Sequence, residues 1–295
     1  MENERLIKLI ENTKFDAHKG SSWKYPENSH GAIVSALLDP DVDAVEFDVK
    51  MTKDGKLVIR HDENMFTTSN SLKTVYNSTL EELRQLKMIA HRVDYWIHYF
   101  QIYSEKNEEY GRRQIELLKK LKNKTNRIMT LDELLDLAPK DKKLLLEVKG
   151  SDEFYKTDKF SKGILELVNA YSYKNIYVHG ANPKLMMWFL NNVKNAKVGI
   201  GLSKDLSPLE LPFYHACFAL SHMKQQLPEI IAALEKRPNR EFHFWKVDTT
   251  REFYLYKMFL EKVVEHGLES QTSVMTNDVP AAKMLFKQQI NNLRK

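Results

Sequence analysis

The chain has 295 residues, 42% of them hydrophobic, and its 45 basic and 40 acidic residues give a formal charge of +5. This composition excludes a disordered chain and argues against nucleic-acid binding, although it suits a small anionic substrate. The only cysteine, Cys217, excludes an internal disulfide, and the charged N-terminal residues leave no apolar core for a signal peptide. With no apolar run long enough to span a bilayer, we expect a cytoplasmic protein.

Runs typical of strands alternate with runs typical of helices along most of the chain. Strand-like runs end near His18, Asp48, His61, Lys149, His179, Leu202, Val247 and Thr276. Helices are expected over residues 31–38, 78–87, 131–137, 159–170, 183–193, 226–236, 250–266 and 280–291. About eight strands in such an alternation favour an α/β barrel over an open sheet. We therefore predict one barrel over residues 1–295.

The connection between His61 and the helix expected from residue 131 is too long for an ordinary strand-to-helix loop. Apolar and aromatic residues recur within it at helical spacing, then a polar break leads to a second helical run. We predict a small helical insertion over residues 88–127. Packing on the barrel explains its aromatic side chains most simply, and contact with a membrane surface is the alternative. These side chains are Tyr95, Trp96, Tyr99 and Phe100.

Carboxylates occupy alternate positions of two strand-like runs. Glu46 and Asp48 share one strand face, about 7 Å apart, and can converge on a single divalent cation. Glu147 and Lys149 share a face in the same way, which adds a third carboxylate and a positive charge for a phosphate oxygen. Charged pairs on a strand usually mark a solvated face, but both faces of a parallel barrel strand are covered. The pattern therefore favours a functional site.

Two histidines at strand ends, His18 and His61, are candidate proton carriers. A two-residue turn at Asp54-Gly55 predicts a hairpin that sets Asp48 opposite His61, beside the carboxylates. A slip of one residue would move this histidine to the other face. The remaining histidines are not grouped in this way with other candidate site residues, and we expect them to be structural. They include His91, His98, His215 and His222, and for His179 we expect a structural role rather than the alternative role in the pocket.

Sequence blocks along nearly the whole chain resemble the glycerophosphodiester phosphodiesterases, in order and at fitting intervals. The N-terminal blocks are DAHKG (16–20), PENS (26–29), EFDVK (46–50), TKDG (52–55) and HD (61–62). The later blocks are STLEELRQL (78–86), TLDEL (130–134), LEVKG (146–150), WKVDT (245–249) and MTNDVP (275–280). The resemblance implies a distorted (β/α)8 barrel that binds one divalent cation, Ca²⁺ or Mg²⁺. It also implies cleavage of a glycerophosphodiester, such as glycerophosphocholine or glycerophosphoethanolamine, to sn-glycerol 3-phosphate and an alcohol.

Site roles follow from the resemblance residue by residue. The metal ligands would be Glu46, Asp48 and Glu147. The acid–base pair would be His18 and His61, and the substrate and phosphate contacts would be Lys19, Lys149 and Trp245. Lys19 stands where the family usually has arginine, so it keeps the charge but loses bidentate phosphate contact. The helical insertion would help to shape the glycerol pocket.

Several alternatives stay open. Toxins of the phospholipase D type share this barrel but carry disulfides, which one cysteine forbids, whereas cleavage of lysophospholipids remains possible. A second alternative is a metal- or phosphate-binding module without turnover, which the intact histidines and carboxylates argue against. Which histidine is the base, which cation binds, which head group is preferred and how the chain assembles are not set by the sequence.

Overall fold

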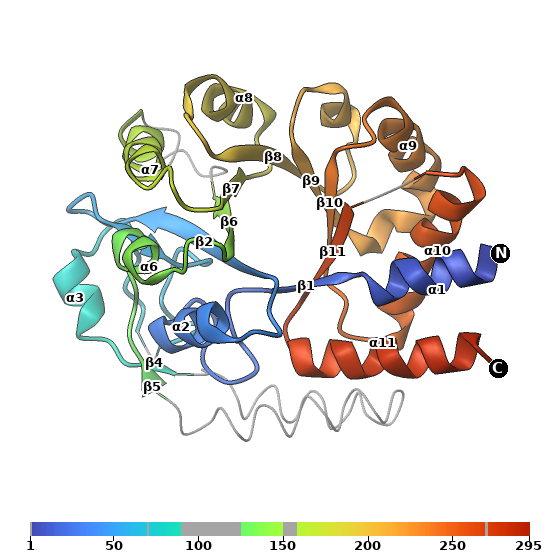
Figure 1. Ribbon diagram of the computed structural model, residues 1–295. Coiled ribbons are helices and arrows are strands. Elements are labelled where there is room, and N and C mark those ends of the chain that lie inside the picture. Colours follow the sequence, from blue (N-terminus) through green and yellow to red (C-terminus); the bar gives the residue numbers. More distant parts are fainter. Residues whose placement is uncertain (1, 70, 90–124, 150–157, 269–270) are drawn as a thin grey trace.

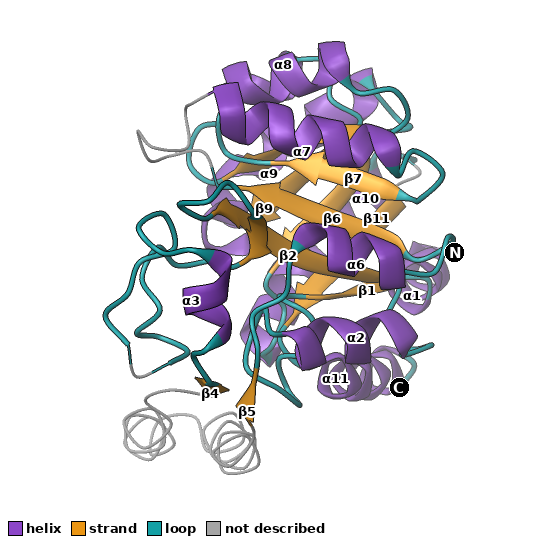
Figure 2. Cartoon of the chain, turned by 90° about the vertical axis from the view of Figure 1, so that its left-hand side faces the viewer, coloured by secondary structure: helices purple, strands orange, loops and turns teal. Residues whose placement is uncertain are grey.

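The computed structural model describes residues 2–69, 71–89, 125–149, 158–268 and 271–295. Within these ranges eight parallel strands form a barrel surrounded by helices (Figure 1; Figure 2). The strands are β1 (Lys14–Ala17), β2 (Ala44–Met51), β6 (Lys143–Val148), β7 (Ile176–His179), β8 (Lys197–Leu202), β9 (His215–Ala219), β10 (Glu241–Trp245) and β11 (Gln271–Thr276). They pair in this order, and β1 pairs with both β2 and β11, so the sheet closes. The predicted (β/α)8 fold is confirmed.

Helices lie between the strands, and those predicted from the sequence begin and end within three residues of the expected positions. They are α2 (His30–Leu38), α3 (Leu80–Arg84), α6 (Leu131–Leu137), α7 (Asp158–Ala170), α8 (Pro183–Asn192), α9 (Met223–Lys236), α10 (Thr250–Glu265) and α11 (Val279–Leu293). Capping boxes fix several starts: Thr130 with Glu133 begins α6, and Thr249 with Glu252 begins α10. No helix in the described ranges has the length and apolar character needed to cross a membrane.

One helix was not predicted. The helix α1 (Glu2–Glu11) precedes β1 and lies beside α11 at the other end of the chain (Figure 1). The side-chain amide of Asn3 donates to the carbonyl oxygen of Leu293 at 3.2 Å. The buried residues of α1, Leu6, Ile7 and Ile10, recur at helical spacing. This spacing is the signal in the sequence from which α1 could have been predicted.

The membership of the barrel differs from the prediction at two strands. The strand that ends before His61, β3 (Leu57–Ile59), pairs antiparallel with β2 and lies outside the barrel. The eighth barrel strand is instead β9, which was not predicted. In its sequence, HACFA, the side chains of His215 and Cys217 face the barrel axis, and the apolar Phe218 faces the helices. The strand therefore lacks the run of apolar residues by which a strand is recognised in a sequence.

The hairpin of β2 and β3 also has a different register from the predicted one. Its turn holds residues 53–55 rather than two residues, and Gly55 takes the positive φ of +78° that closes it. The backbone N–H of Arg60 therefore donates to the carbonyl oxygen of Asp48 at 2.8 Å. The prediction that His61 lies opposite Asp48 is wrong. His61 follows the end of β3 and reaches the barrel mouth from a loop.

The predicted helical insertion falls largely on residues 90–124, outside the described residues, and so do its four aromatic side chains. The two ends of this segment are described. Short strands β4 (Met88–Ile89) and β5 (Thr125–Asn126) pair antiparallel and hold these ends together. Met88 packs beneath them in a small apolar cluster with Val58, Leu83 and Ile128.

Apolar and polar side chains alternate across the barrel wall. On β10, Phe242 and Phe244 face the helices and pack against Phe259 of α10, with ring centroids 6.0 and 4.8 Å apart. Glu241 and His243, which alternate with these phenylalanines along β10, face the barrel axis, where His243 contacts Asp16 of β1. The apolar core therefore lies between strands and helices, and the barrel interior is unusually polar.

Candidate active site

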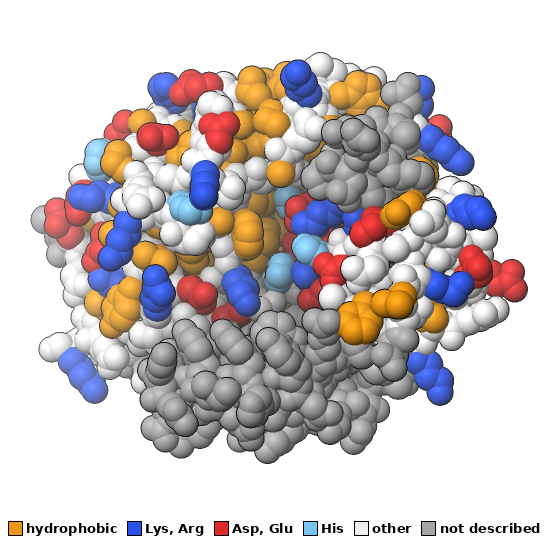
Figure 3. Space-filling model, turned by 180° about the vertical axis from the view of Figure 1, so that it is seen from behind, with side chains coloured by type: hydrophobic (Ala, Val, Ile, Leu, Met, Phe, Trp, Pro, Cys, Tyr) orange, Lys and Arg blue, Asp and Glu red, His pale blue; other side chains and the backbone are white. Residues whose placement is uncertain are grey.

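A cavity of about 530 Å³ opens at the carboxyl ends of the barrel strands, where barrel enzymes place their active sites. Seven of the eight predicted site residues line it: His18, Lys19, Glu46, His61, Glu147, Lys149 and Trp245. The eighth, Asp48, is buried on β2. Figure 3 shows a hollow near the middle of one face, where histidine, acidic and basic side chains lie close together.

Glu46 and Glu147 converge in this cavity with a residue that the sequence assigned a structural role, His179. One ligand atom from each of the three side chains lies within 4.8 Å of the other two. Glu46 and Glu147 come from adjacent strands, β2 and β6, and Glu147 stands opposite His179 of β7. The parallel register thus brings together residues that are 133 positions apart in the chain.

Asp48 is held next to this group by two partners. The side-chain amide of Asn28 donates to Oδ2 at 2.8 Å, and Nζ of Lys149 lies 3.1 Å from Oδ1. The same ammonium donates to Oε1 of Glu147 at 2.6 Å. Lys149 therefore bridges two of the three predicted ligand carboxylates.

Crowded negative charge dominates the electrostatics of the site. Burial, together with the neighbouring carboxylates of Asp48 and Glu147, raises the pKa of Glu46 well above its usual range. Burial and Asp48 likewise raise the pKa of Glu147. Although burial would raise the pKa of Asp48, the ammonium of Lys149 lowers it to about 2. Oxygen donors with an excess of negative charge are the chemistry that a hard divalent cation requires, so these residues fit Ca²⁺ or Mg²⁺.

His18 is oriented by a chain of hydrogen bonds from the last barrel strands. Its Nδ1 lies 2.8 Å from Oδ1 of Asn277, whose side-chain amide donates to Asp248 at 2.7 Å. Because the Asp248 carboxylate can only accept, the amide oxygen of Asn277 must face His18, and Nδ1 of His18 carries the proton. Nε2 then lies on the side of the carboxylates, 3.9 Å from Oε2 of Glu46. Burial and the adjacent Lys19 lower the pKa of His18.

His61 has a different partner, a carboxylate. Its Nδ1 lies 2.7 Å from Oδ1 of Asp62, the next residue in the chain. Thr67 donates to the other oxygen of Asp62 at 2.5 Å, and the buried Arg60 lies 3.7 Å from it. The hydrogen bond from His61 is the main cause that lowers the pKa of Asp62. Asp62 thus stays ionised and accepts a hydrogen bond from the imidazole of His61.

The backbone conformation of Lys19 positions this residue at the site. Its φ of +57° lies in the left-handed region, which is uncommon for a residue with a side chain and is enriched at functional sites. In this conformation its N–H donates to Oε2 of Glu46 at 2.9 Å, and its ammonium pairs with Glu27 at 3.0 Å. Although burial acts the other way, Glu27 and Asp48 raise the pKa of Lys19, which keeps it charged.

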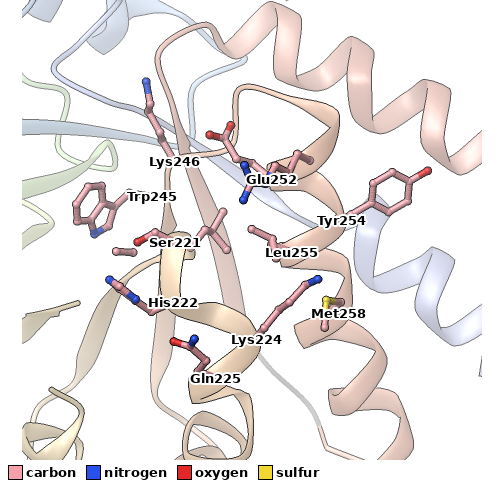
Figure 4. A pocket seen from close by; sticks show the side chains of 13 residues that line it. Ser221, His222, Lys224, Gln225, Trp245, Lys246, Glu252, Tyr254, Leu255 and Met258 are labelled. Atoms are coloured by element: carbon pink, nitrogen blue, oxygen red, sulfur yellow. The ribbon is translucent and has the colours of Figure 1, made fainter. Parts of the chain in front are cut away.

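Trp245 separates the cavity from a second one. This neighbouring cavity, of about 770 Å³, is lined by residues that follow β9 and by the first turns of α10 (Figure 4). Trp245 and Lys246 line both cavities. Apolar side chains of Leu255 and Met258 and the basic Lys224 line the second cavity. The two cavities together offer room for more than a small phosphodiester.

Several residues of the site were missed by reasoning from the sequence. Asn28, Asp62 and Asn277 stood inside the blocks of the resemblance, PENS, HD and MTNDVP, without a role of their own. The partners of Asn28 and Asn277 are distant in the chain, whereas that of Asp62 is the adjacent His61. For His179, the sequence favoured a structural role over a role in the pocket. No local pattern could have found Asp248, because its contact with Asn277 depends on the pairing of β10 and β11.

Comparisons with known proteins agree with this geometry. Residues 18–259 match the Glycerophosphoryl diester phosphodiesterase family. A glycerophosphodiester phosphodiesterase of Bacillus altitudinis is 42% identical over 73 residues, which are 25% of this chain and 29% of that protein's length. The chain thus matches less than a third of the length of this relative.

Solved structures share the fold over nearly the whole chain. A putative glycerophosphoryl diester phosphodiesterase from Silicibacter pomeroyi has a TM-score of 0.69 at 17% identity, covering 94% of both chains. A phosphodiesterase from Oleispira antarctica, solved in complex with the product sn-glycerol-3-phosphate, has a TM-score of 0.61 at 18% identity and covers 95% of this chain and 96% of its own.

Proposed function

Because this chain belongs to the glycerophosphoryl diester phosphodiesterase family, we propose that it hydrolyses glycerophosphodiesters, such as glycerophosphocholine or glycerophosphoethanolamine, to sn-glycerol 3-phosphate and an alcohol. One observation carries the proposal: a single cavity holds two histidines with defined partners, a group of carboxylates and the ammonium of Lys149. The product named for the Oleispira antarctica relative supports the same product here.

The proposed metal ligands are Glu46, Asp48 and Glu147, with His179 as a further donor beside them. A bound Ca²⁺ or Mg²⁺ would supply Lewis-acid stabilisation of the negative charge on the phosphate oxygens. Lys149, which pairs with Asp48 and Glu147, is the proposed contact for a phosphate oxygen at the edge of this group. Lys19 and Trp245 are the proposed contacts on the other side of the cavity.

His18 is the proposed general base. Its Nδ1 proton is engaged by Asn277, so the neutral imidazole presents the Nε2 lone pair on the side of the carboxylates. From that position it takes the proton of the nucleophile, which is the glycerol 2-hydroxyl or a water. If the 2-hydroxyl attacks, the oxygen–phosphorus bond closes a cyclic phosphodiester as the bond to the alcohol breaks, and water opens the ring in a second step.

His61 is the proposed general acid. The Asp62 carboxylate, 2.7 Å from Nδ1, stabilises the imidazolium, so Nε2 can carry a proton for the departing alcohol oxygen. In the second step the roles reverse: His61 takes the proton of water, and His18 returns its proton to the glycerol oxygen. Proton balance is then complete after one turnover.

The test is release of glycerol 3-phosphate from glycerophosphocholine and glycerophosphoethanolamine with Mg²⁺, with Ca²⁺ and with a chelator. We expect metal-dependent release that His18→Ala abolishes and that His266→Ala, at the exposed end of α10, retains. Absence of release with either metal would overturn the proposed substrates.

A substrate with an activated leaving group separates the two histidine roles. A p-nitrophenyl diester of glycerol 3-phosphate needs no protonation of its leaving group. We expect His61→Ala to recover most of its lost rate on this substrate, whereas His18→Ala should lose as much on it as on glycerophosphocholine. The opposite pattern would exchange the roles.

Cleavage of lysophospholipids is a second candidate function, and the second cavity is the observation that favours it. Leu255, Met258 and Tyr254 give this cavity an apolar lining across from Trp245, which borders both cavities (Figure 4). The native chain should release choline from lysophosphatidylcholine. Leu255→Asp should reduce this release but leave the cleavage of glycerophosphocholine unchanged.

Three predictions from the sequence remain predictions. They are a cytoplasmic location, one helical insertion over residues 88–127 and the absence of nucleic-acid partners.

A further inference from the structure

The barrel interior below the cavity carries a group of three side chains, of which the proposed hydrolysis uses only His179. His179 at the end of β7, with His215 and Cys217 of β9, forms it. One ligand atom from each lies within 4.8 Å of the other two, and all three side chains are buried. Two imidazoles and a thiol at this spacing form a donor set different from the carboxylates above.

These histidines lack the hydrogen bonds that buried imidazoles normally have. Neither ring nitrogen of His215 has a partner among the described residues, and Nδ1 of His179 has none either. An unsatisfied buried polar group costs about 1–3 kcal/mol, so such groups are rare without a reason. In the neighbouring His243, Nδ1 lies 2.9 Å from Asp16, whereas Nε2 also has no hydrogen bond among the described residues. The unpaired nitrogens of His179 and His215 therefore have lone pairs available to a metal ion.

The backbone leaves room for this arrangement. Gly199 of β8 pairs with His215, and a Cβ on this glycine would lie 2.1 Å from the His215 ring. Only glycine admits the imidazole at this point. His179 and Cys217 also line the floor of the 530 Å³ cavity, which gives an ion a route from solvent to the group.

We propose that His179, His215 and Cys217 bind a transition-metal ion of the Zn²⁺ class, at a site that adjoins the carboxylate cation site and shares His179 with it. Thiolate and imidazole donors favour such ions over Mg²⁺ or Ca²⁺. With Zn–N near 2.0–2.1 Å and Zn–S near 2.3 Å, tetrahedral donors lie about 3.5 Å apart, so side-chain movements of about 1 Å complete the site. On binding, the Cys217 thiol releases its proton to solvent and its sulfur bonds to the metal. A water fills the fourth position.

His179 belongs to both groups, because it also lies within 4.8 Å of Glu46 and Glu147. The experiment must therefore separate an ion among the carboxylates from an ion held by sulfur. The single cysteine makes this possible, since any metal–thiolate bond in this chain involves Cys217.

The test is titration of the chelator-treated full chain with Co²⁺ in excess Mg²⁺, followed by near-ultraviolet absorption. We expect a sulfur-to-cobalt charge-transfer band that saturates at one Co²⁺ per chain and is removed by Zn²⁺ but not by more Mg²⁺. A folded protein without this band, or a band removed by Mg²⁺, would overturn the proposal.

Variants identify the ligands. Cys217→Ser should abolish the band, and His215→Asn should weaken Co²⁺ binding by more than the 10–100-fold typical of losing an outer-shell partner. His243→Asn is the matched control, because this buried histidine lies next to the group but outside it, and it should keep the band. Equal binding by His215→Asn and the native chain would remove His215 from the site. If circular dichroism shows that a variant does not fold, the proposal is tested by the native chain alone. The results that count are then whether the native chain gives the band and whether Mg²⁺ removes it.

Discussion

The barrel mouth and the barrel interior use histidine in opposite ways. At the mouth, His18 and His61 each have one ring nitrogen fixed by a side chain, Asn277 or Asp62. In the interior, His179 and His215 are more deeply buried and leave ring nitrogens without partners in the described structure. A fixed tautomer suits proton transfer. Buried ring nitrogens without a hydrogen-bond partner either suit a metal ion or lower the stability of the fold.

The difference arises from what surrounds each ring. Polar loops beyond the strand ends supply partners for the mouth histidines. The rings packed around His215 are those of Tyr177, His179 and His243, with Cys217 beside them. Substitutions at the mouth should therefore change turnover, and substitutions in the interior should change stability or metal binding.

The largest effect is expected at the mouth. His18→Ala and His61→Ala should each lower kcat for glycerophosphocholine by at least about 100-fold, because general acid–base groups contribute ~10²–10⁴-fold. Steady-state kinetics beside His266→Ala and thermal melts of each variant provide the check. A loss below about tenfold in a folded variant would remove that histidine from the reaction.

A smaller loss is expected when only the orientation of His18 is disturbed. Asn277→Leu keeps the side-chain size but removes the acceptor for Nδ1, so the proton can move to the wrong nitrogen. By analogy with other outer-shell partners, kcat should fall roughly 10–100-fold with little change in KM. Asn192→Leu, on the exposed surface of α8, is the control. Equal kcat for both variants would show that Asn277 does not position His18.

In the interior, added volume should lower stability rather than turnover. Gly199→Ala places a Cβ 2.1 Å from the His215 ring, and overpacking of this kind costs about 1–3 kcal/mol of unfolding free energy. Gly163→Ala on α7 is the matched control, since its Cβ would meet only Leu57 at 3.7 Å. Urea unfolding measures both, and Gly199→Ala combined with His215→Ala should recover most of the loss if the clash is the cause.

The smallest effect concerns acid stability of the chelator-treated chain. Burial and neighbouring His243 lower the pKa of His215 well below its usual value, so the folded chain does not bind the proton that the unfolded chain binds below about pH 6.5. Unfolding free energy should thus fall as pH drops below that point, by up to about 1.4 kcal/mol per pH unit from this residue. His215→Leu should flatten the slope between pH 6.5 and 4.5, whereas His266→Leu should not. Parallel slopes for His215→Leu and the native chain would contradict this.

The order of the elements was largely readable because helix periodicity and capping are local. Thr130 with Glu133 marks the start of α6 in the sequence as clearly as in the structure. The strand β9 was missed because its inward residues, His215 and Cys217, are polar or small, which hides the alternation that defines a strand. The hairpin register was missed because Asp54-Gly55 suits both two- and three-residue turns, and only the pairing of β2 with β3 decides between them.

The sequence by itself determined the barrel class, the family resemblance and seven of the residues that line the cavity, because strand alternation and short motifs are local properties. Only the tertiary structure decided which residues meet across strands: Asn277 with His18, Asn28 with Asp48, and His179 with both Glu46 and the buried Cys217. The physical reason is that these contacts depend on the relative register of parallel strands joined by long crossovers. Burial then sets the charge of each group, and burial is a property of the closed barrel rather than of any segment.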